Sequence, residues 1–317
     1  PGDLQRSYRF SHPLQINTAE EYRELITRHA LEAGPIEEAF SQEYQDRFSA
    51  VAGDFARHLR DQGWIHTRYF IYFNNKYYFK DPARSAGKGS SLWLLDEPNH
   101  RDDARALSFF AALAKRGLRE YPQVPILIRT DISRVEWIRD LLAGQIDLNC
   151  VSQKLIERNR YLLDDRRRFG REFWQYGSSN DPSATNIPMR AWCWRAWVNG
   201  ADGIVPWNTV AGMGSWDHAE PLTVFYPGMK FGQDEPFPSI RLKAYRRGQQ
   251  DVEYLVLLAQ KQGWDREAVA QAVGKALNLS GRTLQVDEED AGTLSLNRVN
   301  NDQMEKLKMR VAKALMQ

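Results

Sequence analysis

The stretch Ser91-Leu92-Trp93-Leu94-Leu95-Asp96-Glu97-Pro98-Asn99 joins a short apolar run directly to two adjacent carboxylates and a proline. An apolar run of this length that ends in a turn signal is typical of a buried β-strand, so the acids fall where the strand stops and its loop begins. In α/β barrels this edge carries the catalytic groups. Because neighbouring side chains of an extended segment point in opposite directions, we expect Asp96 and Glu97 to serve different parts of one ligand.

The same residues also fit a purely structural interpretation. A carboxylate just before a helix often caps it, and Asn99 or Asp102 is placed to open the helix that follows, with nearby acids favoured by the helix dipole. The choice between the two interpretations depends on what the other strand ends carry.

Short apolar strands alternate with amphipathic helices through the middle of the chain. Strands are expected at 67–73, 91–95, 124–128, 146–151, 172–176 and 203–208. Helices are expected at 102–120, 133–142, 153–169 and 189–198, the second of them opened by Ser133 and Glu136 at capping-box spacing. This alternation predicts a parallel sheet with right-handed crossovers. We therefore predict the α/β class and a (β/α)8 TIM-type barrel that is incomplete or irregular at its N-terminal strands.

The regions on either side of this alternation are mostly helical. Helices are expected at 18–33, 35–60 and 240–262, followed by a helix at 266–277, a hairpin at 283–296 and a last helix at 302–315. We predict two domains: a barrel over residues 1–262 and a small, mainly helical appendage over 263–317 that packs on it. The stretch 209–238 is long, Gly-rich and aromatic, with few helix or strand signals, which is typical of a functional loop.

Most of the expected strands end in side chains that can hold a polar ligand. They are Asn74 and Asn75, Asp96 and Glu97, Arg129 and Asp131, Tyr176, and Trp207 with Asn208. If the sheet closes into a barrel, all of them lie at its carboxyl-terminal mouth, where enzymes with this fold keep their active sites. Their convergence is stronger evidence for a site than any one residue.

The aromatic content indicates what kind of ligand this mouth holds. Ten tryptophans and thirteen tyrosines are more than a core needs, and several fall at expected strand ends. Carbohydrate-binding clefts use aromatic faces in this way, because the C–H face of a sugar needs a flat apolar surface beside polar groups. We expect a carbohydrate substrate and at least one sugar platform among Trp174, Trp207 and Trp216.

Other partners are disfavoured by composition. The net charge of +2 is small and no basic stripe is interleaved with aromatics, so we expect no nucleic acid partner. No apolar run approaches the ~20 residues that span a membrane. The six histidines are scattered singly, Cys150 and Cys193 lack metal-ligand spacing, and no Gly-rich phosphate loop occurs, so we expect no metal and no cofactor.

The chain begins at Pro1, without an initiator Met or a signal peptide. We interpret it as a processed or truncated piece of a longer protein. Export to the periplasm or the extracellular space, with the signal segment absent from this chain, is compatible with that interpretation.

Four segments together resemble glycoside hydrolase family 123 and the related domain of unknown function 4091: 93–98, 174–176, 196–207 and 238–255. The last segment, a Ser-Arg helix that ends in Asp251-x-Glu253-Tyr254, is the most specific. The resemblance runs from about residue 50 to residue 260. It implies a (β/α)8 barrel that hydrolyses β-linked N-acetylhexosaminides, best known for N-acetylgalactosamine, with retention and without a protein nucleophile.

The resemblance also implies roles for the two acids. Asp96 would orient the 2-acetamido group of the substrate and stabilise the oxazolinium formed when the acetamido oxygen attacks the anomeric carbon. Glu97 would protonate the leaving oxygen and then activate water.

Two alternatives stay open at this point. A non-catalytic carbohydrate-binding or scaffold barrel would keep the aromatic mouth and use the acids as hydrogen-bond acceptors. A retaining or inverting glycosidase would instead pair Glu97 with a distant carboxylate such as Asp131 or Asp217. The separation of the carboxyl groups distinguishes these mechanisms, at about 5 Å for a protein nucleophile and roughly 6.5–9.5 Å for inversion.

Overall fold

The computed structural model describes residues 36–74, 93–98, 101–133, 141–153, 156, 172–177, 185–207, 209–218, 223–280, 282–284, 293–296 and 298–317. Its main sheet has the strand order β1-β2-β3-β4-β5. The strands are β1 (Tyr69–Tyr72), β2 (Ile126–Asp131), β3 (Leu148–Ser152), β4 (Glu172–Gly177) and β5 (Gly203–Pro206). β1 pairs with β2, and β4 with β5, in parallel. The α/β class is confirmed, and the described part of the chain contains a five-stranded sheet, not a complete eight-stranded barrel.

The strand predicted at 91–95 is wrong for the residues that the structure describes. Residues 93–98 form bends and irregular chain. The backbone N–H of Leu94 donates to the side chain of Asp103, at 3.0 Å, and that of Glu97 donates to the carbonyl oxygen of Asp131, at 2.9 Å. Glu97 also has a left-handed backbone conformation, with φ 56°. A side-chain partner and a left-handed residue together prevent a regular strand ladder.

The chain divides within β3 into two compact units. Unit 1 comprises residues 1–149 and 161–172, and unit 2 comprises 150–160 and 173–317. The domain boundary predicted at residue 262 stays a prediction. The helices predicted at 18–33, 133–142 and 153–169 lie wholly or mostly outside the described residues.

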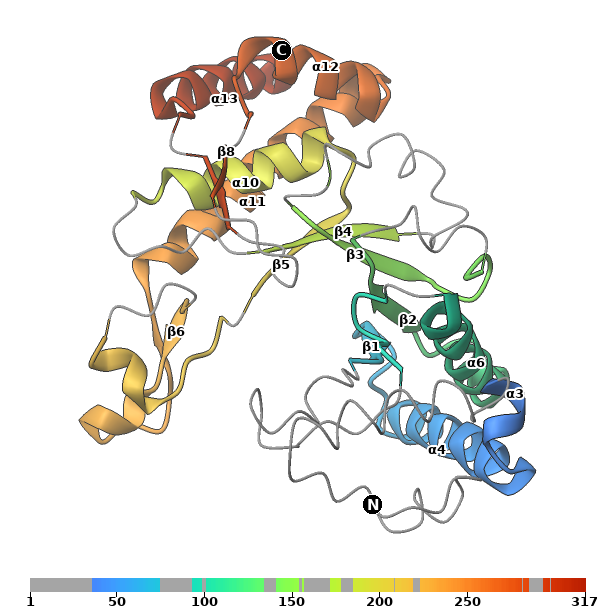
Figure 1. The fold of residues 1–317 in the computed structure, drawn as a ribbon. Helices are drawn as coiled ribbons and strands as arrows, with labels where there is room; N and C mark the ends of the chain where they lie inside the picture. The colour runs from blue at the N-terminus through green and yellow to red at the C-terminus, as the bar shows by residue number, and fades with distance from the viewer. Residues whose placement is uncertain are drawn as a thin grey trace. The chain divides into compact units, whose positions relative to one another are not determined.

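Unit 1 places two long helices, α4 (Gln42–Asp61) and α6 (Arg101–Leu118), side by side (Figure 1). Glycine makes the contact possible: a Cβ added to Gly117 would lie 1.9 Å from the carbonyl oxygen of Ser49. The Ser49 hydroxyl crosses the same contact and donates to the carbonyl oxygen of Leu113 at 2.8 Å. The helices therefore meet at backbone distance, and α6 also packs on β2.

The single helix predicted at 35–60 is two helices, α3 (Ile36–Ala39) and α4. Ser41 is the reason, because its side chain accepts a hydrogen bond from the N–H of Tyr44 at 3.2 Å and begins a new helix there.

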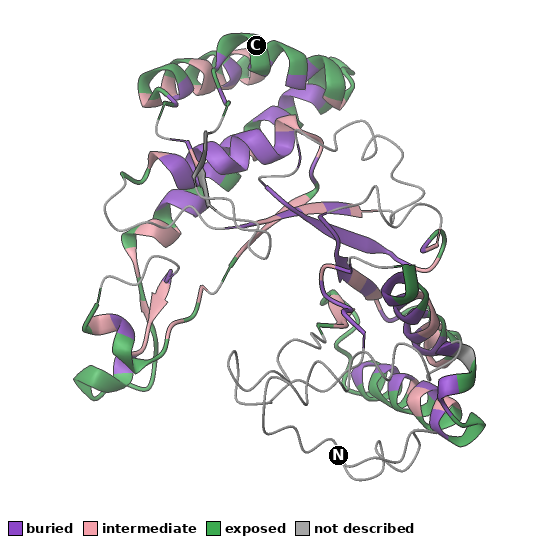
Figure 2. Ribbon diagram, in the orientation of Figure 1, coloured by how far each residue is buried: buried purple, intermediate pink, exposed green. Residues whose placement is uncertain are grey.

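Unit 2 is built around α10 (Ile187–Val198), which is buried from Pro188 to Trp197 (Figure 2). A helix that is buried on all sides needs neighbours on all sides, and α10 packs on β5, α11 (Ile240–Gln262) and α12 (Arg266–Ala276). α13 (Asn301–Met316) packs on α11. The hairpin strands β8 (Arg282–Leu284) and β9 (Thr293–Ser295) pair antiparallel. The elements predicted after residue 240 are confirmed within a few residues at their ends.

A buried charge network joins α10, α11 and α13. Asp251, on α11, accepts hydrogen bonds from the guanidinium of Arg190 and, at 3.0 Å, from the indole N–H of Trp194. The ammonium of Lys308 lies 2.7 Å from the other carboxylate oxygen of Asp251. The Asp251 side chain is completely buried. Asp251, the aspartate of the most specific motif of the resemblance, thus holds three helices together.

The 209–238 stretch contains a small fold of its own in the part that the structure describes. β6 (Phe225–Tyr226) and β7 (Phe237–Pro238) pair antiparallel; the 3-10 helix η2 (Met213–Trp216) precedes β6, and the 3-10 helix η3 (Gly228–Phe231) lies between the two strands in the chain. No helix among the described residues is long and apolar enough to cross a membrane.

Candidate active site

Two buried acids of unit 1, Asp96 and Asp131, gather at the carboxyl ends of β1 and β2. Tyr72 and Arg129 are neighbours in the parallel register of these strands. Arg129 binds Asp131 with two parallel hydrogen bonds, Nε to Oδ1 and Nη2 to Oδ2, each 3.0 Å long. The Tyr72 hydroxyl donates to Oδ2 of Asp131 at 3.2 Å, and the Arg129 guanidinium lies 4.5 Å from the centre of the Tyr72 ring. Asp96 and Asp131 are 5% and 2% exposed, so both carboxylates are removed from water.

Burial controls the titration of this cluster. It raises the pKa of Asp131 above its ordinary value of 3.8, an effect that the charge of Arg129 opposes and the nearby charge of Asp96 reinforces. Burial also raises the pKa of Tyr72, and the charges of Asp131 and Asp96 and a hydrogen bond with Asp96 raise it further. Tyr72 therefore stays protonated, and its hydroxyl donates to Asp131.

Glu97 is held by a different partner. Its Oε2 accepts from the backbone N–H of Ser133 at 2.7 Å, and its Oε1 accepts from the Ser133 hydroxyl at 2.5 Å. Asp96 is hydrogen-bonded to Tyr72 on β1, whereas Glu97 is hydrogen-bonded to Ser133, two residues after the end of β2. The two adjacent acids thus have separate environments, as the sequence predicts. The cause is the left-handed conformation of Glu97, not the alternation of a strand.

The aromatic candidates belong to unit 2. Trp207 follows β5, donates its backbone N–H to the carbonyl oxygen of Gly177 at 2.7 Å, and is 43% exposed. Trp174, on β4, is packed on the neighbouring strand, because a Cβ added to Gly203 would lie 2.8 Å from the indole ring. Tyr176 is half-buried near the end of β4. Of these three aromatic residues, Trp207 presents the most open ring.

Trp216 lies in an aromatic cluster inside the 209–238 stretch. Its ring centre is 4.7 Å from that of Tyr226 and 5.0 Å from that of Phe231. Its indole N–H donates to the carbonyl oxygen of Pro227 at 2.8 Å. These contacts make Trp216 a core residue of this small fold.

The structure thus brings together Asp96, Glu97, Arg129 and Asp131 within unit 1. Within unit 2 it places Tyr176 near the end of β4, Trp207 directly after β5 and Trp174 inside β4. Asn74 is exposed two residues after the end of β1, and Asn75 and Asn208 lie outside the described residues. The convergence of both groups on one cavity stays a prediction.

Sequence reasoning missed two residues of the unit 1 cluster. Tyr72 is the last residue of an aromatic strand, and this strand-end position is the sequence signal that could have identified it as a site residue. Ser133 was interpreted only as the start of a helix, although its hydroxyl donates to Glu97.

The distant carboxylates proposed as partners of Glu97 are both ion-paired. Asp131 is bound by Arg129. Asp217 is exposed and lies 2.5 Å from the ammonium of Lys230, whose hydrogen bond and charge lower the pKa of that carboxyl. Among the described residues, no group of three or more His, Cys, Asp or Glu side chains is arranged to hold a metal ion.

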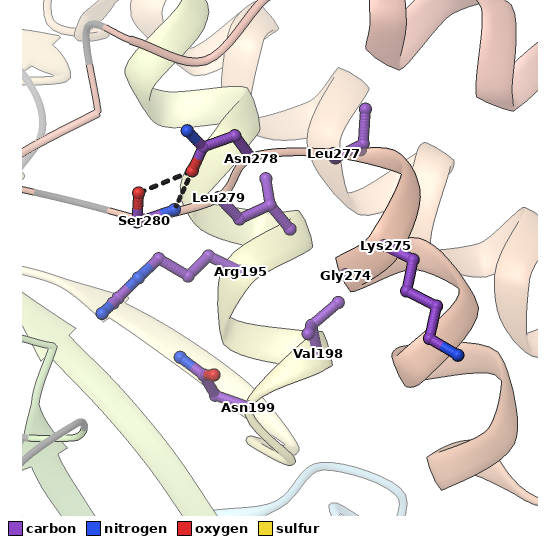
Figure 3. A pocket seen from close by; sticks show the side chains of 9 residues that line it. All are labelled: Arg195, Val198, Asn199, Gly274, Lys275, Leu277, Asn278, Leu279 and Ser280. Atoms are coloured by element: carbon purple, nitrogen blue, oxygen red, sulfur yellow. Dashed lines mark hydrogen bonds between the residues drawn. The ribbon is translucent and has the colours of Figure 1, made fainter.

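A cavity of about 440 Å³ lies in unit 2 (Figure 3). It is lined by Arg195, Val198 and Asn199 at the end of α10, by Gly274 and Lys275 of α12, and by residues 277–280. Asn278 turns its side-chain oxygen back to Ser280, whose N–H and hydroxyl both donate to it. None of the residues predicted to form the site lines this cavity.

The fold and the unit 1 cluster define a mixed α/β protein with buried acids at the carboxyl ends of parallel strands. No family model matches the chain, and no curated protein matches it. Among solved structures, the chain is similar to a family 123 glycoside hydrolase from Clostridium perfringens, whose structural analysis concerns glycolipid glycan hydrolysis. The TM-score is 0.50 and the sequence identity 14%, over 87% of this chain. The chain spans 44% of the length of that enzyme, and the likeness concerns the fold.

Proposed function

We propose that the protein is a glycoside hydrolase that acts on a β-linked N-acetylhexosaminide, of the N-acetylgalactosaminide type, or on a related glycan. The mechanism that fits is substrate-assisted hydrolysis with retention. The observation that carries the proposal is the separate environment of two adjacent acids, Asp96 bonded to Tyr72 and Glu97 bonded to Ser133. The fold, similar to that of a glycoside hydrolase, supports the same proposal.

Each acid has a task that suits its surroundings. The buried Asp96 carboxylate accepts the N–H of the substrate acetamido group, which aims the acetamido oxygen at the anomeric carbon. As that oxygen attacks, the glycosidic bond breaks and positive charge develops on the oxazolinium. A carboxylate in a site with little water stabilises such charge strongly. Water then attacks the anomeric carbon from the face that the leaving group vacated, and the acetamido group is restored.

Glu97 handles the protons of both steps. It protonates the leaving oxygen in the first step and takes a proton from water in the second. Both of its oxygens accept hydrogen bonds from Ser133 in the structure, so the leaving oxygen of the substrate replaces the Ser133 hydroxyl as the partner of Oε1. The exposed ring of Trp207 is the platform proposed for a sugar face, with Tyr176 and Trp174 on the neighbouring strand β4 and with Asn74, Asn75 and Asn208 as further contacts.

A second candidate function is glycan binding without hydrolysis. It is favoured by the state of Glu97, because a carboxylate that accepts two hydrogen bonds is an acceptor and not a proton donor. In this function the acids bind sugar hydroxyl groups, and Trp207 binds a sugar face.

The experiment that separates the two is a screen of aryl N-acetyl-β-hexosaminides beside the matching aryl β-hexosides. The proposal expects hydrolysis only of the substrates that carry the acetamido group, since that group supplies the nucleophile. Glycan binding without turnover of either set favours the second candidate. Equal hydrolysis of both sets contradicts substrate assistance and indicates a carboxylate nucleophile or an activated water.

A further inference from the structure

We infer that Tyr72 is the positioning residue for Asp96, and that Asp131 and Arg129 form the anchor that fixes its hydroxyl. The inference deepens the proposed function and relies on it for the reaction that Asp96 serves. The geometry that carries it lies entirely within unit 1.

The first step of the argument is that the Tyr72 ring is held on two sides. Tyr72 is the last residue of β1 and the register neighbour of Arg129 on β2. The guanidinium lies 4.5 Å from the ring centre, and the hydroxyl reaches Oδ2 of Asp131 at 3.2 Å. A tyrosine has two side-chain torsions, and a contact at the ring together with one at the hydroxyl restrains both.

The second step is that the anchor is itself rigid. Asp131 is 2% exposed and is held by two parallel hydrogen bonds from Arg129, the strongest geometry available to a carboxylate. Its backbone carbonyl oxygen accepts the N–H of Glu97 at 2.9 Å. Asp131 therefore restrains Tyr72 through the Asp131 side chain, and it restrains the Asp96-Glu97 pair through the Asp131 backbone.

The third step concerns the phenolic proton. Tyr72 has one proton and contacts two carboxylates, Asp131 and Asp96. Because Arg129 donates to both oxygens of Asp131, that carboxylate stays satisfied when the hydroxyl turns its proton to Asp96. Tyr72 is thus placed to orient Asp96 through its hydroxyl while Arg129 continues to bind Asp131.

The test is Tyr72→Phe, with Tyr69→Phe as the matched control. Tyr69 starts the same strand, and its ring packs edge-on against Phe55, 6.0 Å between centres. Loss of orienting hydrogen bonds in a site of this kind costs on the order of ten- to hundredfold in kcat. We expect that loss for Tyr72→Phe on aryl N-acetyl-β-hexosaminides, with KM changed less than about threefold and with equal losses for good and poor leaving groups. Tyr69→Phe keeps the kcat of the wild type.

A double-mutant cycle separates positioning from a general structural role. If Tyr72 acts only through Asp96, Tyr72→Phe causes no further loss of kcat in the Asp96→Asn variant. A further loss as large as in the wild type overturns the inference, as does an unchanged kcat in Tyr72→Phe alone. If Tyr72→Phe does not fold, Arg129→Lys replaces it in the same cycle, since a lysine cannot make both hydrogen bonds to Asp131.

Crystal structures of the wild type and Tyr72→Phe distinguish failure of this inference from failure of the proposed function. If the wild type hydrolyses none of the aryl glycosides, the proposed function fails, and the position of Asp96 still decides the inference. We expect the Asp96 carboxylate to adopt a new rotamer in Tyr72→Phe. An Asp96 side chain that keeps its wild-type position overturns the inference, whatever the activity.

Discussion

Ser133 donates hydrogen bonds to both carboxylate oxygens of Glu97, from its backbone N–H at 2.7 Å and from its hydroxyl at 2.5 Å. Glu97 has a backbone φ of 56°, a conformation that non-glycine residues rarely adopt and that costs on the order of 1–3 kcal/mol. The two hydrogen bonds help to offset this cost. The contact therefore stabilises a turn and also holds the proposed acid.

Ser133→Ala removes the hydroxyl and leaves the backbone donor in place. We expect the free energy of unfolding to fall by about 1–3 kcal/mol, because a hydrogen bond to a charged group is lost and the strained turn remains. Urea unfolding monitored by circular dichroism measures the change. Ser133→Thr keeps the hydroxyl and is the control, expected close to the wild type. Equal stability of all three proteins contradicts a structural role for the contact.

The division of labour between the acids predicts different responses to the leaving group. Glu97→Gln should lose most rate on substrates with poor leaving groups and recover partly on activated aryl glycosides, which need little protonation. Asp96→Asn should lose rate even with an excellent leaving group, because the charge of the oxazolinium is left unmatched. The measurement is kcat/KM across a series of aryl leaving groups. Equal losses across the series in both variants count against these roles.

Trp207→Ala should weaken glycan binding and leave the fold intact, because its ring is 43% exposed at a strand end. Loss of one aromatic platform raises Kd by roughly 5- to 150-fold, from about 1–3 kcal/mol of lost contact. Trp264, 52% exposed and away from the strand ends, provides the control, and Trp264→Ala should bind as the wild type does. Isothermal titration with an N-acetylhexosamine oligosaccharide measures both. Unchanged affinity in Trp207→Ala eliminates the platform.

Asp251→Asn should destabilise the protein by about 3–5 kcal/mol, because the buried Arg190 guanidinium loses its buried carboxylate and keeps only the more exposed Glu305. The side chains of this pair are 3% and 0% exposed. Asp54, paired with Arg57 on the surface, gives the matched control, and Asp54→Asn should change stability by less than about 1 kcal/mol. Denaturant unfolding of both variants tests the contrast, and a loss of similar size in the two would contradict it.

The raised pKa of Asp131 predicts how stability varies with pH. Above pH 3.8 and up to the folded-state pKa, the folded protein keeps a proton on this carboxyl that the unfolded chain releases. Unfolding then releases a proton, so raising the pH through this window lowers the free energy of unfolding. Asp131→Asn removes this contribution. The difference in stability between wild type and variant should therefore shift in favour of the variant as the pH rises from 3.8, and a constant difference argues against a raised pKa.

Periodicity along the chain was enough to predict most of the elements. The helix at 240–262 agrees with α11 at both ends, and the strand predicted at 172–176 agrees with β4 within one residue. Helix and strand periods are local properties, so they can be recognised without knowing which segments meet. The expected separation of Asp96 and Glu97 was predicted for the same reason, although the strand assumed to carry them did not form in the described residues.

The strand predicted at 91–95 shows what local sequence patterns cannot predict. The apolar run before Asp96 has the composition of a strand, but the N–H of Leu94 bonds to Asp103, and a ladder cannot form there. Whether the N–H of Leu94 bonds to a neighbouring strand or to Asp103 depends on where α6 lies. The apolar pattern carries no information about that position.

By itself, the sequence determined the α/β class, the order of most of the elements and the presence of two adjacent acids after an apolar run. Only the tertiary structure decided which side chains hold those acids. Ser133 is 36 residues from Glu97, and Tyr72 is 59 residues from Asp131. The physical reason is that a hydroxyl or a guanidinium can bond any acceptor within about 3 Å, and sheet register, not sequence distance, selects the acceptor it reaches.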